Sequence, residues 1–123
     1  LFQPSVGLEL SKEKITARDN QISEEFITAT ITRFDDEKIP TKFTIKFISN
    51  LQNAYPIHYN GSRITEFTTR ELLGKDSKDI LQFKVFGKNG EAQTSTYNLD
   101  IGLLWNNTKI SGQDKRIYVS VDG

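Results

Sequence analysis

Strict alternation of apolar and polar residues is the feature that most constrains the fold of this chain. Side chains two positions apart on a strand share one face, so an alternating segment turns one apolar row to a core and one polar row to water. This period predicts half-buried antiparallel strands. The alternation runs through residues 43–47 and 81–85, and through Tyr97, Leu99, Ile101, Leu103 and Trp105.

Turn signals divide the chain into the segments that we expect to be strands. Asn60-Gly61 and Asn89-Gly90 each lie beside an alternating run and predict two-residue type I′ hairpin turns, in which both central residues need φ > 0. Arg18-Asp19-Asn20 and Asn106-Asn107 are further turn signals. The expected strands cover residues 6–10 with a continuation near 15, then 24–34, 41–49, 63–69, 80–86, 91–105 and 116–121.

Two places interrupt the strand pattern. Thr68 and Glu71 have the spacing of a capping box and Gly74 follows them, so we expect a short helical turn over residues 68–74. The segment 91–105 is long for one strand, so we expect a bulge or a change of sheet there, at Gly102.

The inward rows of these strands predict a single core between two sheets. We expect an all-β fold, an antiparallel immunoglobulin-like β-sandwich of about eight or nine strands, with a small β-barrel as the alternative. Trp105 is expected to anchor a corner of the core, because its ring has a large area to hide. The other expected core residues are Ile27, Ala29, Ile31, Phe43, Ile45, Phe47, Leu81, Phe83, Val85, Leu99, Ile101, Ile117 and Val119.

Length and composition limit the class of protein. At 123 residues with 36% hydrophobic content, the chain is long enough for one domain, residues 1–123, and too short for two. Its 16 Lys and Arg balance its 16 Asp and Glu, so the bulk field that attracts nucleic acid or an anionic membrane is missing. The chain has no Cys and no Met, and no apolar run approaches the roughly 20 residues that span a bilayer. We expect the soluble part of a longer protein, with any membrane anchor outside it.

Candidate partner-binding residues fall in three places. Tyr55, Ile57, His58 and Tyr59 precede the Asn60-Gly61 turn, where amphipathic rings near a loop tip offer large contact area at low entropic cost. Their alternative role is to cap the open end of the sandwich. Phe34 and Tyr118 have the outward parity of their strands, and the alternative for Phe34 is to curl over the end of the sheet.

The residue types do not assemble a catalytic or metal motif. His58 is the only His, and no Ser or Cys nucleophile motif or second His accompanies it. The acidic turn at Asp35-Asp36-Glu37 has no further ligand spacing for Ca²⁺ and is expected to be a solvated hairpin tip. We predict no catalytic residue, no cofactor and no metal.

Residues 72–91 contain a leucine, an alternating apolar run and a turn signal, at Leu73, Leu81, Phe83, Val85, Gly87 and Asn89-Gly90. This pattern resembles the corner leucine, the F strand and the following hairpin of fibronectin type III and related adhesion modules. The resemblance departs at Leu81, where that family prefers Tyr, and in the length of chain after Gly90. In its order of strands, from residues 27–31 through 43–47 to a closing 117–122, the chain is more similar to prokaryotic, especially archaeal, cell-surface sandwich domains. These include the archaellum motor accessory proteins that bind the surface layer.

The resemblance implies a non-enzymatic extracytoplasmic binding or assembly module that makes protein–protein contacts at the cell surface, anchored by an N-terminal helix. A soluble domain of an archaellum motor accessory protein is the specific form of this hypothesis. A carbohydrate-binding module that uses Tyr55, Tyr59 or Trp105 as sugar platforms is the alternative. A hydrolase would need two converging acids, and Glu66 with Glu71 is the pair to inspect.

Two further expectations concern the surface. Strands at residues 6–10 and 116–121 are expected to be sheet edges, through which the chain pairs with another cell-surface or envelope protein, or with a second copy as a homodimer. The sequons Asn60-Gly61-Ser62 and Asn106-Asn107-Thr108 make Asn60 and Asn106 candidate glycosylation sites.

Overall fold

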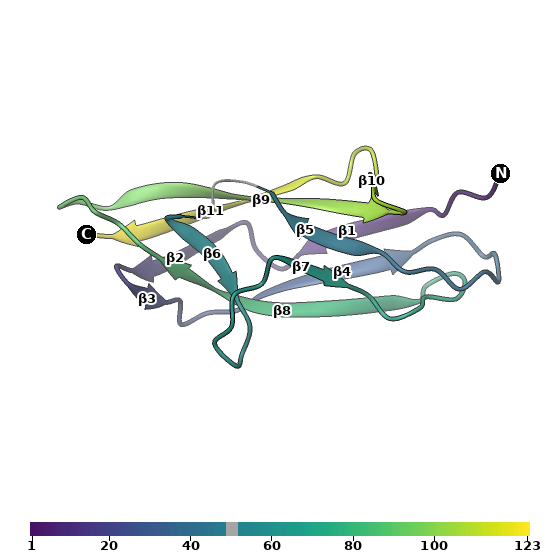
Figure 1. Ribbon diagram of the computed structural model, residues 1–123, viewed down its shortest axis with the longest axis horizontal. Helices are drawn as coiled ribbons and strands as arrows, with labels where there is room; N and C mark the ends of the chain where they lie inside the picture. The colour runs from purple at the N-terminus through teal and green to yellow at the C-terminus, as the bar shows by residue number, and fades with distance from the viewer. Residues whose placement is uncertain (49–51) are drawn as a thin grey trace.

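The computed structural model describes residues 1–48 and 52–123, and Figure 1 shows their strands in two packed layers. None of these residues is helical, and so no helix among them is long and apolar enough to cross a membrane. The strands are β1 (Val6–Leu10), β2 (Lys14–Arg18), β3 (Gln21–Ile22), β4 (Ile27–Arg33), β5 (Thr44–Phe47), β6 (Ala54–Ile57), β7 (Glu66–Thr68), β8 (Lys78–Gly87), β9 (Ser95–Trp105), β10 (Thr108–Lys109) and β11 (Lys115–Asp122).

The strands form two sheets. Sheet 1 has the order β1-β4-β8-β3, and β6 also pairs with β8; sheet 2 has the order β2-β11-β9-β5-β7, and β10 pairs with β9. The all-β sandwich is therefore confirmed, with the short strands β3, β6 and β10 added to the expected ranges. One pair departs from the expected antiparallel pattern, because β2 runs parallel to β11. The chain places β1 in sheet 1 and then crosses to sheet 2 to form β2.

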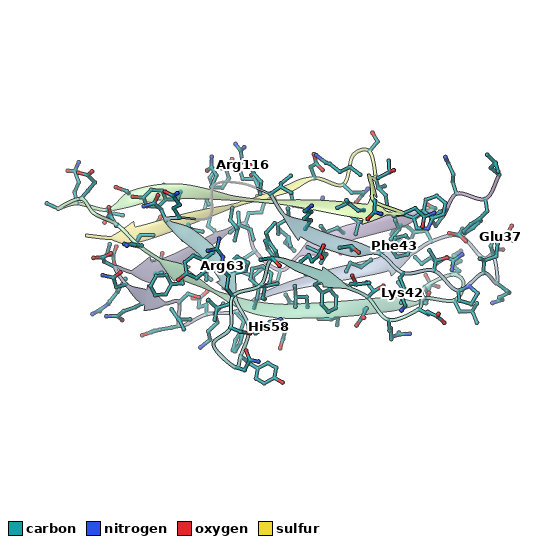
Figure 2. The ribbon with its side chains drawn as sticks, in the orientation of Figure 1. Glu37, Lys42, Phe43, His58, Arg63 and Arg116 are labelled. Carbon is teal, nitrogen blue, oxygen red and sulfur yellow. The ribbon has the colours of Figure 1, made fainter. Side chains whose placement is uncertain are left out.

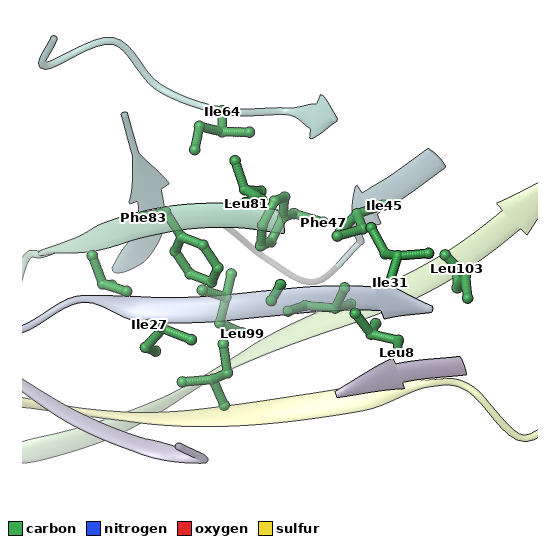
Figure 3. Close-up of a cluster of buried hydrophobic side chains, with 14 of the residues drawn as sticks. Leu8, Ile27, Ile31, Ile45, Phe47, Ile64, Leu81, Phe83, Leu99 and Leu103 are labelled. Carbon is green, nitrogen blue, oxygen red and sulfur yellow. The ribbon is translucent and has the colours of Figure 1, made fainter. Parts of the chain in front are cut away.

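Every aliphatic and Phe residue that the alternation placed in the core is buried. The rows of the two sheets meet in one cluster, which Figure 3 shows in close-up. Phe47 of sheet 2 and Phe83 of sheet 1 contact each other edge to face, with ring centroids 5.4 Å apart. Trp105 is half-buried against this core and contacts Phe2 edge to face. The expected end of the Phe47 strand at Ser49 lies outside the described residues.

The predicted hairpin at Asn89-Gly90 is wrong, because β8 and β9 belong to different sheets. Asn89 is buried, and its side chain organises the crossing between the sheets. Its amide donates to the carbonyls of Gln93 and Val121, and its carbonyl oxygen accepts from the N–H of Glu91. An Asn side chain that bonds nearby backbone stabilises an irregular loop as well as a tight turn, and the sequence signal does not separate the two.

The Asn60-Gly61 turn is a longer hairpin than predicted. The N–H of Gly61 donates to the carbonyl of His58, and Ile57 pairs with Arg63, whereas a two-residue turn at Asn60-Gly61 would pair it with Ile64. Gly61 has φ +88°, while Asn60 is not among the residues with positive φ, so this is the three-residue loop that ends in a left-handed glycine.

Asn106-Asn107 does form the expected tight turn. The two residues have φ of 50° and 63°, and Trp105 pairs with Thr108 across the turn.

Two expected interruptions of the sheets are also wrong. Leu72 is buried and pairs with Thr41 as an isolated bridge, and no helical turn forms over residues 68–74. Leu73, which the fibronectin resemblance placed at the corner, is exposed instead. Gly102 lies within the continuous strand β9 and pairs with Lys46, so the strand does not change sheet there. In each case a pairing with a distant strand overrides the local signal.

The expected edges need correction as well. β11 is not an edge, because it lies between β9 and β2. β1 does lie at the edge of sheet 1, but the side chain of Gln113 accepts a hydrogen bond from the N–H of Leu8 on it at 3.0 Å. A side chain that takes an edge N–H in this way blocks the addition of another strand.

Arg33 ends the inward row of β4 and is fully buried, at 0% exposure, which the alternation did not predict. Its guanidinium donates to the carbonyls of Leu72 and Ile39 and to the carboxylate of Asp35, and lies 5.4 Å from the ring centre of Phe2. A buried charge is tolerated when it is paired and hydrogen-bonded. The Arg33 side chain thus connects the segments around Asp35, Ile39 and Leu72 at one end of the sandwich.

The core assignment predicts a contrast between two substitutions. Phe83→Ala should lower the free energy of unfolding by about 3–5 kcal/mol, because it removes a buried ring and leaves a cavity between the sheets. Lys46→Ala, at an exposed position of β5, should change it by less than about 0.5 kcal/mol. Denaturant unfolding followed by circular dichroism measures both. Similar losses in the two variants would contradict a one-sided sheet.

The Arg33 cluster predicts a pH-dependent effect. Hydrogen bonds from Arg33, with those from the backbone of Ser5 and Glu37, hold the pKa of Asp35 below its ordinary value of 3.8 against a smaller opposing effect of burial. The stabilisation is complete above the unfolded-state pKa and is lost as the pH falls through the lower folded one. Asp35→Asn should therefore destabilise the protein near neutral pH. The difference in the free energy of unfolding between this variant and wild type should shrink below pH 3.8.

Unfolding of both proteins across acidic pH measures this difference. Asp36→Asn, at the exposed neighbouring position, is the matched control. A difference between Asp35→Asn and wild type that does not vary with pH would show that Asp35 contributes nothing through its charge.

Candidate protein-binding surfaces

The structure does not bring the six predicted partner-binding residues into one patch. Tyr55, Ile57, His58 and Tyr59 lie on β6 and in the hairpin after it, which projects from the sandwich where Figure 2 labels His58. Phe34 follows β4, and its ring packs against Gly7 of β1 while it stays 50% exposed. Tyr118 lies on the outer face of sheet 2.

The hairpin presents one open ring. Tyr59 is 90% exposed at the tip, whereas Ile57 is only 5% exposed. The prediction of Ile57 as a contact residue is therefore wrong, because the packing of the hairpin leaves it almost no surface. The half-buried His58 donates its backbone N–H to Ser62. Asn60 is exposed beside Tyr59, and its carbonyl oxygen accepts from the hydroxyl of Ser62.

Tyr55 lies on the outer face of sheet 1 and is already in contact with other side chains. Its ring stacks on Phe86 with centroids 5.0 Å apart, and the guanidinium of Arg63 lies 4.5 Å from its ring centre. A sugar platform needs an open ring face, so this packing disfavours Tyr55 as one. The half-buried Trp105 is likewise held at a corner of the core by Phe2.

The stacked ring of Tyr55 belongs to a larger apolar surface, which we call the aromatic face. Ile22 of β3 and Tyr55 of β6 both pair with Phe86 of β8, one on each side of that strand. Two residues earlier on β8, the ammonium of Lys84 lies 4.7 Å from the ring centre of Phe26. Ile22 and Phe26 are 44% and 46% exposed. The face therefore combines exposed apolar area with cations held over rings.

A flank groove opens beside the aromatic face. Its volume is about 910 Å³, and its two walls are the whole of β2 and residues 21–25. The turn at Asp19-Asn20 joins these walls at one end, and an ion pair between Lys12 and Glu25 links them at the other. The groove extends onto the outer face of sheet 2, where Thr96, Tyr118, Ser120 and Asp122 line it.

Neither the acidic loop nor the predicted acid pair forms a reactive cluster. In the part of the chain that the structure describes, no group of three or more His, Asp or Glu side chains is placed to hold a metal ion. Asp35 of the acidic turn is held by Arg33. Glu66 pairs with Lys46 across two strands, and Glu71 lies beyond the end of that strand next to the Leu72 bridge.

Most of these surfaces left only a weak signal in the sequence. Phe86 and Ile80 had outward parity opposite the core row of β8, which is a signal for surface apolar residues. Phe26 likewise has the parity opposite to the buried Ile27, Ala29 and Ile31, and the ammonium of Lys84 lies over its ring. No sequence feature predicted the flank groove, because the groove depends on which strands become neighbours in the fold.

Solved structures with the same architecture place the chain in a fold class. A CARDB domain from Pyrococcus furiosus, solved in complex with di-metal ions, matches with a TM-score of 0.59 at 16% identity over 96% of this chain and 93% of that one. An ASH/PapD-like domain of human CEP192 matches with a TM-score of 0.54 at 12% identity, over 94% of this chain and 84% of that one. The periplasmic chaperone SfaE matches at 0.51 and 12% identity, over 94% of this chain and 57% of that one.

These likenesses establish the fold and nothing finer. The chain is an immunoglobulin-like β-sandwich, as the sequence predicted. No protein-family model matches the sequence, and no curated protein matches it.

Proposed function

We propose that this domain is a non-enzymatic binding module that holds another protein at the cell surface, on the extracytoplasmic side of the membrane. The observation that carries the proposal is the aromatic face. An antiparallel sheet with one solvated side normally carries polar residues there, whereas sheet 1 presents Phe26, Tyr55 and Phe86. Aromatic residues and Arg are the types enriched at protein interfaces.

The chemistry of the face favours a partner of defined character. Lys84 lies over Phe26 and Arg63 lies over Tyr55, so cations sit among the rings. A complementary surface would carry apolar groups surrounded by carboxylates, which match these cations and improve specificity and the rate of association. The open ring of Tyr59 on the projecting hairpin adds an anchor beside this face.

The location and the finer identity of the partner rest on the sequence resemblance. The similarity to archaeal cell-surface domains supports an envelope protein as the partner, and for an archaellum motor accessory protein that partner would be the surface layer. Asn60 and Asn106 are both exposed in turns, which supports their accessibility as glycosylation sites in such a compartment.

Site-specific crosslinking in the source cells tests the proposal. A photoreactive phenylalanine analogue replaces Phe86 or Tyr59 in the full protein, and the matched control replaces exposed Lys46 on sheet 2. We expect both experimental positions to crosslink to one envelope protein and the control to give no such adduct. Adducts that consist of polysaccharide would favour the carbohydrate-binding alternative. No adduct, equal adducts at the control, or a cytoplasmic partner would contradict the proposal.

A further inference from the structure

We infer that β2 is a docking edge for an extended strand of the partner protein, a strand that carries acidic side chains at alternate positions. This inference rests on the proposed function for the existence of a protein partner, and it assigns the contact to a different surface. The flank groove is the space that this strand would occupy.

Half of the backbone polar groups of β2 face the groove. The N–H of Tyr118 donates to the carbonyl of Glu13 at 2.7 Å, which fixes the phase of the parallel ladder between β11 and β2. In a parallel ladder one residue bonds the neighbouring strand and the next turns its N–H and C=O the other way. The backbone groups of Lys14, Thr16 and Arg18 therefore point away from β11 and toward the groove.

The groove has the shape that an added strand needs. Paired strands lie about 4.7–4.9 Å apart, so one strand added to the edge of β2 would continue sheet 2 and occupy the groove beside it. Residues 21–25 form the opposite wall. The described alternatives are poorer, because Gln113 takes the N–H of Leu8 on β1 and β7 has only 3 residues.

The charges on β2 disfavour a second copy of this chain as the occupant. Two-fold pairing along the full length of β2 would place Thr16 opposite Thr16 and Lys14 opposite Arg18 of the other copy. Like charges directly opposite each other destabilise a strand pair. The expected homodimer through an edge strand is therefore not favoured at this edge.

The charges on β2 itself select acidic side chains at the positions beside them. The acids that also line the groove lie elsewhere: Glu24 and Glu25 are on the opposite wall, and Asp122 is on β11 next to Arg18. Lys14 and Arg18 are exposed on the outer face of sheet 2, and neither forms an ion pair with another described residue. Alternate residues of an added strand would stand beside them, where carboxylates complete cross-strand pairs. The intervening residues would face inward beside Ile15 and Ala17, which turn to the core. The occupant is thus an extended segment that alternates acidic with apolar residues.

The probe that tests this is a blocked peptide of alternating Glu and Val, compared with one of alternating Lys and Val. We expect only the Glu peptide to bind this chain in fluorescence anisotropy. Amide hydrogen exchange by NMR should then slow at Lys14, Thr16 and Arg18 in the complex. A Glu peptide N-methylated at alternate residues should lose binding, because it cannot form the ladder.

Variants on the protein side separate charge from backbone. The double variant Lys14→Glu with Arg18→Glu should lower the affinity for the Glu peptide about tenfold and raise the affinity for the Lys peptide. Lys46→Glu on the same sheet should change neither affinity. Thr16→Pro removes an N–H that the β11 ladder does not use, and should also weaken binding about tenfold relative to Thr16→Ala. Circular dichroism checks the fold of each variant. The charge variants and the N-methylated peptide decide the result if Thr16→Pro does not fold.

The outcomes distinguish the inference from the proposed function. The inference is overturned if the Glu peptide does not bind, or if it slows amide exchange only at residues outside β2. It is also overturned if the charge reversal leaves the affinity unchanged. If the aromatic face still crosslinks to an envelope protein in cells, the proposed function survives that result. If neither surface contacts a protein, both fail.

Discussion

The inner face of each sheet in this protein is a continuous row of aliphatic and Phe side chains, and the two inner faces are buried against each other. The contact between Phe47 and Phe83 lies in the core that results. This constraint also explains the path of the chain, which must supply strands to both sheets. The N-terminal segment does so by leaving sheet 1 after β1 and joining sheet 2 as β2. Because nothing pairs with the far side of β2 among the described residues, the crossing creates an open edge.

Alternation predicted which side chains are buried, because burial of a strand residue depends on parity and parity is local. It did not predict which strands pair, because pairing joins residues far apart in sequence. Leu72 illustrates the limit: its bridge to Thr41 replaces an expected helical turn. Asn89 illustrates it again, since the same Asn-Gly signal that suits a hairpin supports a crossing between sheets in this fold.

The candidate surfaces were less predictable than the core. Tyr59 followed from a turn signal. Phe26 and Phe86 have the outward parity of their segments, but parity alone does not show that they meet on one face. The burial of Ile57 depended on a one-residue difference in hairpin register, which composition does not reveal. The open edge of β2 is a property of its missing neighbour and not of its own residues, so no motif encodes it. Arg33 similarly gains its role only when Leu72 and Asp35 come together.

Amide hydrogen exchange of the free chain tests most directly whether β2 is an open edge. If it is, the N–H groups of Ile15 and Ala17 bond β11 and exchange slowly, whereas those of Lys14, Thr16 and Arg18 exchange fast. The N–H of Leu8 on β1, which donates to Gln113, should be slower than those three. Uniform protection along residues 14–18 would show that this edge is already covered and would contradict the central claim.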